Sequence, residues 1–106
     1  MELVQVHQEA VRAAQQATQS FLAQHGDRDC CGFAWVTVYE KGTSKFVREL
    51  KKLGFRRAYG GGYQLWNPSG SHTQSITAKE EGAQAYVAVI RKHYPEVKIY
   101  AGSRMD

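Results

Sequence analysis

The order of helical and strand patterns along the chain limits its fold more than any other feature of the sequence. Four segments have the alternation or the β-branched and aromatic content that is typical of strands, namely residues 33–39, 56–59, 63–66 and 97–101. Helical periodicity lies between them, from a cap at Thr43 or Ser44 to Leu53 and over residues 77–94, and a third helical pattern over residues 2–25 comes first. The predicted order is one helix followed by strand, helix, strand, strand, helix and strand.

Local stop and turn signals support these boundaries. Gly26 ends the first helical pattern and Pro95 ends the last, and Thr77-Ala-Lys-Glu80 has the spacing of a capping box at the start of that last helix. The glycine triplet at 60–62 permits the positive φ angles of a tight hairpin, and Asn67-Pro-Ser-Gly70 fits a type I turn. The third strand is therefore expected to end at this turn.

This order is the connectivity of a ferredoxin-like split βαβ domain with an extra N-terminal helix, so it predicts an α+β fold. One domain is expected over residues 1–106, with the N-terminal helix at 1–26 and the βαββαβ core at 31–106. The expected sheet order is 4-1-3-2, with two helices on one face. The helix over residues 2–25 is expected to cover the other face, where it would lie over the rings of Phe33, Trp35, Trp66 and Tyr100.

Length and composition restrict the class of protein. A chain of 106 residues is long enough for one core and too short for two. No apolar run approaches the roughly 18 residues that a membrane-spanning helix needs, and the N-terminus lacks the layout of a secretion signal. Cys30 and Cys31 are adjacent and do not suit an ordinary disulfide with each other. The sequence therefore predicts a soluble, cytoplasmic protein with reduced thiols, no membrane partner and no cofactor.

Basic side chains gather in the second part of the chain. Residues 43–106 carry eleven basic and five acidic side chains, whereas residues 1–42 carry three basic and five acidic ones. A surface with an excess of positive charge attracts phosphate-bearing partners through its summed field. The alternative is a solvated helix face without a partner.

The predicted topology brings three segments that are distant in sequence to one end of the sheet. These are the start of the first strand at Cys30 and Cys31, the exit of the third strand at 67–75, and the tail at 103–106. The last helix begins beside them, and the free N–H groups of a helix N-terminus favour an anion. The sequence therefore predicts a site for a nucleotide or another anionic, phosphate-bearing molecule. Its residues are Asn67, Ser69, Ser71, His72, Thr73, Gln74 and Arg104, with Arg56 and Arg57 as further cations.

Two other kinds of chemistry are alternatives at this end. Cys31 and His72 have the residue types of a thiol nucleophile and its base, with Asn67 or Asp106 to orient the base, as in a small hydrolase or transferase. A metal site would lack the usual C-x-x-C spacing. Its ligands would be Cys30, Cys31, His25 and His72. Because adjacent cysteines do not easily direct both sulfurs at one ion, we expect no metal. The glycine triplet matches no nucleotide-binding fingerprint, so it is interpreted as a hairpin turn. The favoured function is a non-enzymatic binding protein.

An aromatic sheet face is a further alternative site. Ferredoxin-like sheets can stack bases on aromatic side chains, as RNA-recognition motifs do, and Trp35 and Trp66 would serve this purpose on the first and third strands. Against nucleic-acid binding, the segment 57–65 does not match the RNP1 pattern, and the N-terminal helix is expected to cover this face. A third alternative is an inhibitor of a host protein, which would need neither a pocket nor an aromatic face.

The oligomeric state depends on the N-terminal helix. If this helix packed against a second copy of the chain, the protein would be a homodimer.

Several motifs together resemble a group of small, uncharacterised phage-encoded proteins. They are Cys31-Gly-Phe-Ala-Trp-Val36, Leu65-Trp-Asn-Pro-Ser-Gly70, Lys79-Glu-Glu-Gly-Ala83 and Ser103-Arg-Met-Asp106. The resemblance covers residues 31–106 and brings no established reaction or ligand. It implies a viral source and a role in the cytoplasm of the infected cell, such as interference with a host system.

Overall fold

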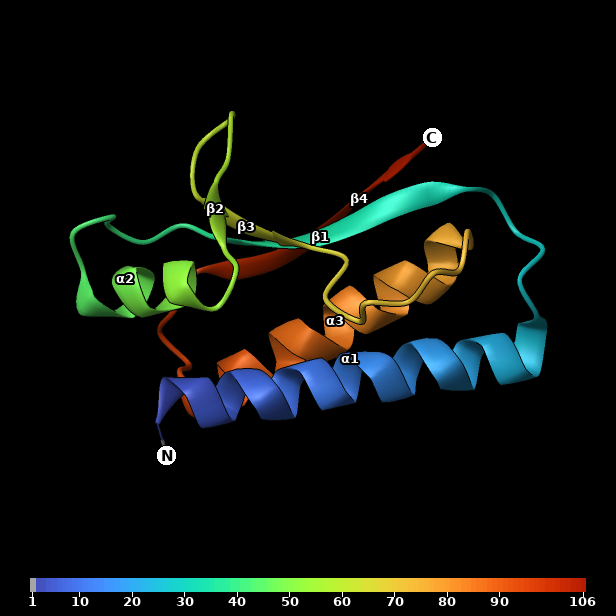
Figure 1. The fold of residues 1–106 in the computed structure, drawn as a ribbon, viewed down its shortest axis with the longest axis horizontal. Coiled ribbons are helices and arrows are strands. Elements are labelled where there is room, and N and C mark those ends of the chain that lie inside the picture. The colour runs from blue at the N-terminus through green and yellow to red at the C-terminus, as the bar shows by residue number, and fades with distance from the viewer. Residues whose placement is uncertain (1) are drawn as a thin grey trace.

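A computed structural model describes residues 2–106 and contains three helices and one four-stranded sheet (Figure 1). The helices are α1 (Leu3–His25), α2 (Lys45–Lys52) and α3 (Ile76–His93). The strands are β1 (Gly32–Val38), β2 (Arg56–Arg57), β3 (Tyr63–Trp66) and β4 (Ile99–Met105). The α+β class and the predicted order of elements are confirmed. Within residues 2–106, no helix is long and apolar enough to cross a membrane.

The sheet has the order β2-β3-β1-β4, and each neighbouring pair is antiparallel. Read from the other edge this is the predicted order 4-1-3-2. Side chains alternate across the central strand β1, so Ala34, Val36 and Val38 are buried on the helical face of the sheet. Phe33 and Trp35 lie on the opposite face, which we call the open face.

Helix α1 packs against α3 on the side away from the sheet, so the predicted position of residues 2–25 over the aromatic rings is wrong (Figure 1). Small residues allow the two helices to approach closely. Ala14 is fully buried, and a Cβ added to Gly82 would lie 2.6 Å from Thr18 Oγ1 and 3.2 Å from the Ala14 carbonyl oxygen. The Thr18 hydroxyl donates a hydrogen bond to the Ala78 carbonyl oxygen (2.7 Å) across the same contact. The alanine stripe of α1 therefore serves a helix–helix interface.

Helix α3 begins at Ile76, one residue before Thr77, so the prediction that a capping box at Thr77 starts this helix is wrong. Ser75 is the N-cap residue, and its Oγ accepts a hydrogen bond from the Ala78 N–H (3.0 Å). An antiparallel bridge between Cys31 and Ser75 holds the N-cap residue at the end of the sheet. The tertiary position of Ser75 thus sets the start of this helix.

Strand β4 runs four residues beyond the predicted end of the last strand at Ala101. Its last residues pair with the first half of β1, in the register Phe33 with Arg104 and Gly32 with Met105. The Asp106 N–H continues the ladder by donating to the Cys31 carbonyl oxygen (3.1 Å). The segment predicted to be a short tail is therefore part of the sheet, because the length of β1 offers it backbone partners.

Candidate functional site

The open face carries most of the exposed aromatic surface of the domain. The strand registers arrange its residues in three rows across the sheet. These rows are Phe33 with Arg104, then Trp66 with Trp35 and Gly102, then Arg56 with Gln64, Thr37 and Tyr100. None of these strand residues is acidic, and no helix lies over them (Figure 1). The face therefore combines rings with positive charge.

Three rings form a cluster at the end of this face that lies near the chain's C-terminus. The ring centroids of Trp35 and Trp66 are 4.8 Å apart, and those of Phe33 and Trp66 are 6.1 Å apart in an edge-to-face arrangement. Trp66 is 48% exposed and Phe33 is 36% exposed. Large rings this accessible, on adjacent strands of a single face, form a platform on which a flat ligand can stack.

Gly102 makes room for this platform. A Cβ at position 102 would lie 2.7 Å from Trp35 Nε1 and 2.8 Å from Trp35 Cε2, so the indole lies directly against the backbone of β4. Any other residue would push the ring away from the sheet. A glycine inside an alternating strand pattern signals such a close approach, and this signal was present in the segment predicted to be a tail.

Cations surround the aromatic cluster. The guanidinium of Arg104 lies 5.9 Å from the Phe33 ring centroid, and the Lys79 ammonium lies 5.5 Å from it. Arg56, in the third row, is exposed at the other side of the tryptophan pair. Arg57 is exposed but occupies the position opposite Tyr63, which belongs to the helical face. Of the three arginines in the predicted anion site, Arg56 and Arg104 therefore belong to the open face.

A second aromatic pair lies at the far end of the open face. The ring centroids of Tyr39 and Tyr100 are 6.0 Å apart, and the Arg91 guanidinium lies 5.5 Å from the Tyr100 ring. Tyr100 is 51% exposed and Tyr39 is 50% exposed. Aromatic side chains with nearby cations thus follow the sheet from one end to the other.

The predicted convergence of three segments at one end of the sheet is confirmed. Besides the bridge to Ser75, Cys31 Sγ donates to Gln74 Oε1 (3.4 Å), and the Asp106 N–H reaches the Cys31 carbonyl oxygen. A shallow cavity of about 210 Å³ lies where the segments meet. Its lining residues are Cys31, Gly32, Phe33, Gln74, Lys79 and Asp106.

The polar residues of the loop at 67–75 largely bind one another. Asn67 Nδ2 donates to the Ser71 carbonyl oxygen (2.9 Å), and Ser69 Oγ accepts from the Ser71 N–H (3.3 Å). The Thr73 N–H donates to Ser71 Oγ (3.2 Å), and the Thr73 hydroxyl donates to Asp27. Ser69 and Thr73 are buried, whereas His72 and Gln74 are exposed. Much of the unusual hydrogen-bonding capacity of this run holds the loop in shape.

The N-terminus of α3 is also satisfied within the chain. The Ile76 N–H donates to the Cys30 carbonyl oxygen (2.9 Å), and the Thr77 N–H donates to Asp29 Oδ2 (3.1 Å). The side chains of Ser75 and Thr77 lower the pKa of the Asp29 carboxyl by hydrogen bonding. An anion at this helix end would have to displace a carboxylate that already occupies the position. The nucleotide site at this end therefore stays a prediction that the hydrogen bonds do not favour.

Cys31 and His72 are not joined by any hydrogen bond among residues 2–106. The Cys31 thiol is bonded to Gln74, and the His72 ring is exposed on the loop outside the cavity that Cys31 lines. The same part of the chain contains no group of three or more His, Cys, Asp or Glu side chains that could hold a metal ion.

No family model, no curated protein and no solved structure matches this chain. The resemblance to phage-encoded proteins stays a prediction.

Proposed function

We propose that this chain is a ferredoxin-like, non-enzymatic domain that binds single-stranded nucleic acid on the open face of its sheet. Bases would stack on Trp66, Trp35 and Phe33, and phosphates would lie beside Arg104, Lys79 and Arg56. The observation that carries the proposal is the tryptophan pair, with ring centroids 4.8 Å apart on a face that no helix covers. This is a phosphate-bearing partner of the kind that the basic second half of the chain indicates.

The energetics of the aromatic cluster favour a stacked ligand. The exposed rings leave apolar surface in contact with water. A ligand that buries this surface gains about 25 cal/mol of binding free energy per Å². Stacking of one base on an aromatic side chain contributes roughly 1–3 kcal/mol and tolerates any base. Successive rows of this face are separated by two strand residues, or about 6–7 Å. Two or three bases in an extended strand would therefore meet rings and cations in turn.

A single strand fits this face better than a duplex. The bases of a duplex are stacked on each other, so their flat surfaces are not accessible to Trp66, whereas an unpaired strand can place them on it. The cations at the edges of the cluster provide charge for the backbone, and no acidic residue lies in the three strand rows between them. If the phage resemblance holds, the target would be RNA or single-stranded DNA in an infected cell, and binding would interfere with a host process.

A fluorescence titration tests this proposal. Trp66 and Trp35 are the two tryptophans of the chain, so stacking should quench the intrinsic emission. We expect saturable quenching by single-stranded oligonucleotides at low salt, weaker binding at higher salt, and much weaker binding of the matched duplex. Unchanged emission with RNA and DNA strands of all four bases would contradict the proposal.

A further inference from the structure

The outer edge of β4 presents backbone groups that have no partner. This strand is at the end of the sheet and pairs only with β1. The Asp106 N–H donates to the Cys31 carbonyl oxygen, so the even-numbered residues of this strand bond to β1 and the odd-numbered ones point outward. The outward groups include the N–H and C=O of Ala101 and Ser103. No hydrogen bond within residues 2–106 reaches them.

The first outward carbonyl group of this edge already has a hydrogen-bond partner, and within residues 2–106 the groups that follow it do not. Arg91 Nη2 donates to the carbonyl oxygen of Ile99 (2.7 Å), which occupies the first outward acceptor of the strand. From Ala101 onward the edge has neither a covering side chain nor a proline. Such an edge is a template for an added strand.

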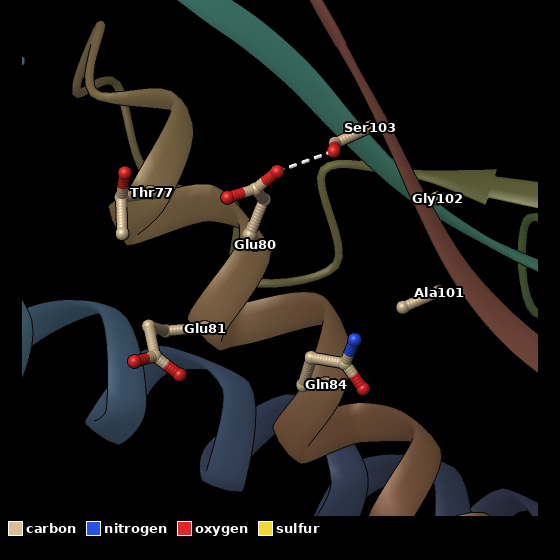
Figure 2. A pocket seen from close by; sticks show the side chains of 7 residues that line it. All are labelled: Thr77, Glu80, Glu81, Gln84, Ala101, Gly102 and Ser103. Carbon is tan, nitrogen blue, oxygen red and sulfur yellow. Dashed lines mark hydrogen bonds between the residues drawn. The ribbon is translucent and has the colours of Figure 1, made fainter. Parts of the chain in front are cut away.

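A groove of about 370 Å³ runs between the open part of this edge and α3 (Figure 2). Its walls are Thr77, Glu80, Glu81, Gln84, Ala101, Gly102 and Ser103. Thr77 and Gln84 are about 10 Å apart along the helix, at about 1.5 Å per residue. That length matches about three residues of a strand at about 3.3 Å each. An added strand would thus direct two alternate side chains into the groove.

The groove is acidic on a protein whose net charge is +4. Glu80 accepts a hydrogen bond from the Ser103 hydroxyl, and Glu81 is exposed (Figure 2). Neither carboxylate forms a salt bridge among residues 2–106, where the ion pairs involve Glu9. The neighbouring Lys79 turns away, because its ammonium donates to the Gly32 carbonyl oxygen (2.9 Å). Two carboxylates therefore line the groove without a cation, with Glu80 pointing toward Ser103 and Glu81 on the side of α3 that is farther from β4 (Figure 2).

We propose that this groove binds an extended peptide segment of a partner protein, which adds to β4 as a fifth strand. The outward groups of Ala101 and Ser103 pair with the peptide backbone. Lysine or arginine side chains at alternate positions of the peptide lie against Glu80 and Glu81. The other side chains of the peptide lie on the open face, along the border of the sheet formed by Tyr100 and Gly102. The edge of β4 and α3 hold the peptide, so this proposal does not rest on nucleic-acid binding.

A second copy of the chain is a poorer occupant of the same edge. Pairing two β4 strands would bring two α3 helices to the same side of a continuous sheet, each with Glu80 toward the junction and Glu81 one residue further along the helix. Like charges placed opposite each other are destabilising, whereas a basic peptide neutralises them. The charge of the groove thus selects a foreign, basic strand.

The test uses the full chain and a short peptide that alternates lysine with valine. We expect saturable chemical-shift changes in an amide NMR titration at Ala101, Ser103 and Glu81. A peptide with glutamate in place of lysine should not bind. Peptides N-methylated at alternate amides, in the register that would face β4, should lose binding because they cannot donate to the edge. No binding of the lysine peptide at millimolar concentration, or equal binding of both N-methylated registers, would overturn the proposal.

Variants of the chain test the charge of the groove and the backbone groups of the β4 edge separately. Glu80→Gln with Glu81→Gln should weaken peptide binding several-fold and remove its salt dependence, whereas Glu49→Gln with Glu96→Gln, outside the groove, is the matched control for charge. Ala101→Pro removes an outward N–H without removing a bond to β1, so it should abolish peptide binding and preserve the far-UV spectrum and oligonucleotide binding. If the chain instead forms a concentration-dependent dimer that Ala101→Pro dissociates, the edge belongs to a second copy and the peptide assignment is wrong.

Discussion

The indole ring of Trp35 lies against Gly102 on the neighbouring strand, at a distance that leaves no space for a Cβ atom. Gly102→Ala should therefore displace Trp35 and separate it from Trp66. We expect weaker oligonucleotide quenching and a shift in tryptophan emission, with a stability loss of about 1 kcal/mol, the low end of the range for overpacking. Gly60→Ala, at a position with no atom within 4 Å of the added Cβ, is the control. Unchanged binding by Gly102→Ala would show that the tryptophan pair is not the platform.

Trp66 should contribute to binding far more than to folding. About half of its surface is already exposed in the folded chain, so Trp66→Ala removes less buried surface than the truncation of a core residue would. Loss of one stacked base costs roughly 1–3 kcal/mol, or roughly a 5- to 150-fold rise in Kd. Trp66→Phe should retain most of the affinity, and Val4→Ala on α1 controls for the loss of an exposed apolar side chain. Fluorescence anisotropy of a labelled oligonucleotide measures the affinity of each variant, and urea denaturation measures its stability. If Trp66→Ala lowered the free energy of unfolding as much as the free energy of binding, the prediction would be wrong.

Arg104 should act on the salt dependence of binding. Its guanidinium lies 5.9 Å from the Phe33 ring centroid at the rim of the aromatic cluster. If it neutralises one phosphate, Arg104→Gln should reduce the slope of log K against log salt by about 0.7. Arg12→Gln on α1 makes the same change of net charge away from the open face. An equal effect of the two variants would point to a general charge effect instead of a local contact.

Gly82 should be required for the contact between α1 and α3. Alanine has a higher helix propensity than glycine by about 1 kcal/mol, which alone would stabilise Gly82→Ala. The added Cβ would lie 2.6 Å from Thr18 Oγ1 and 3.2 Å from the backbone oxygen of Ala14, and overpacking of this kind costs about 1–3 kcal/mol. Because the Ala14 backbone cannot move without shifting α1, we expect a net loss of about 1 kcal/mol in urea denaturation. A stabilised variant would show that α1 adjusts freely.

His7 should make folding stability depend on pH. Burial lowers the pKa of the His7 imidazole below 6.5, and its Nδ1 is hydrogen-bonded to the Tyr86 hydroxyl (2.7 Å). As the pH falls through 6.5, the unfolded chain takes up this proton before the folded one, so stability is lost until the pH passes the folded pKa. His7→Gln removes this contribution. The free energy of unfolding of the wild type relative to His7→Gln should therefore decrease between pH 7 and lower pH, and a constant difference would contradict the assignment.

Much of the fold can be predicted from local patterns. The helix over residues 2–25, its stop at Gly26 and the strand order follow from periodicity, glycine positions and the order of elements. Two boundaries could not be predicted, because they depend on partners elsewhere in the chain. Ser75 caps α3 where the bridge to Cys31 holds it, and the last residues of β4 are a strand because β1 offers them backbone groups.

The residue types of both candidate sites can be predicted from the sequence, whereas their accessibility cannot. The loop at 67–75 has the expected hydrogen-bonding groups, but they bind one another and the start of α3. The sequence indicates Trp35 and Trp66 as a stacking pair, but it also predicts that the N-terminal helix covers them. The decisive difference is the position of α1, which leaves the rings accessible.

The sequence by itself determines the local elements of this protein and the face of the sheet on which each strand residue lies, because helix and strand periodicities are local. It does not determine which surface the apolar stripe of α1 covers, since a stripe of alanines fits a sheet or a helix equally well. Only the tertiary structure decides this, and the reason lies in α3, which is apolar on two sides. Ala83, Val87 and Ile90 pack in the core with the sheet. The adjoining side, with Ala78, Gly82 and Tyr86, needs a second helix against it, and this leaves the aromatic face of the sheet in contact with solvent.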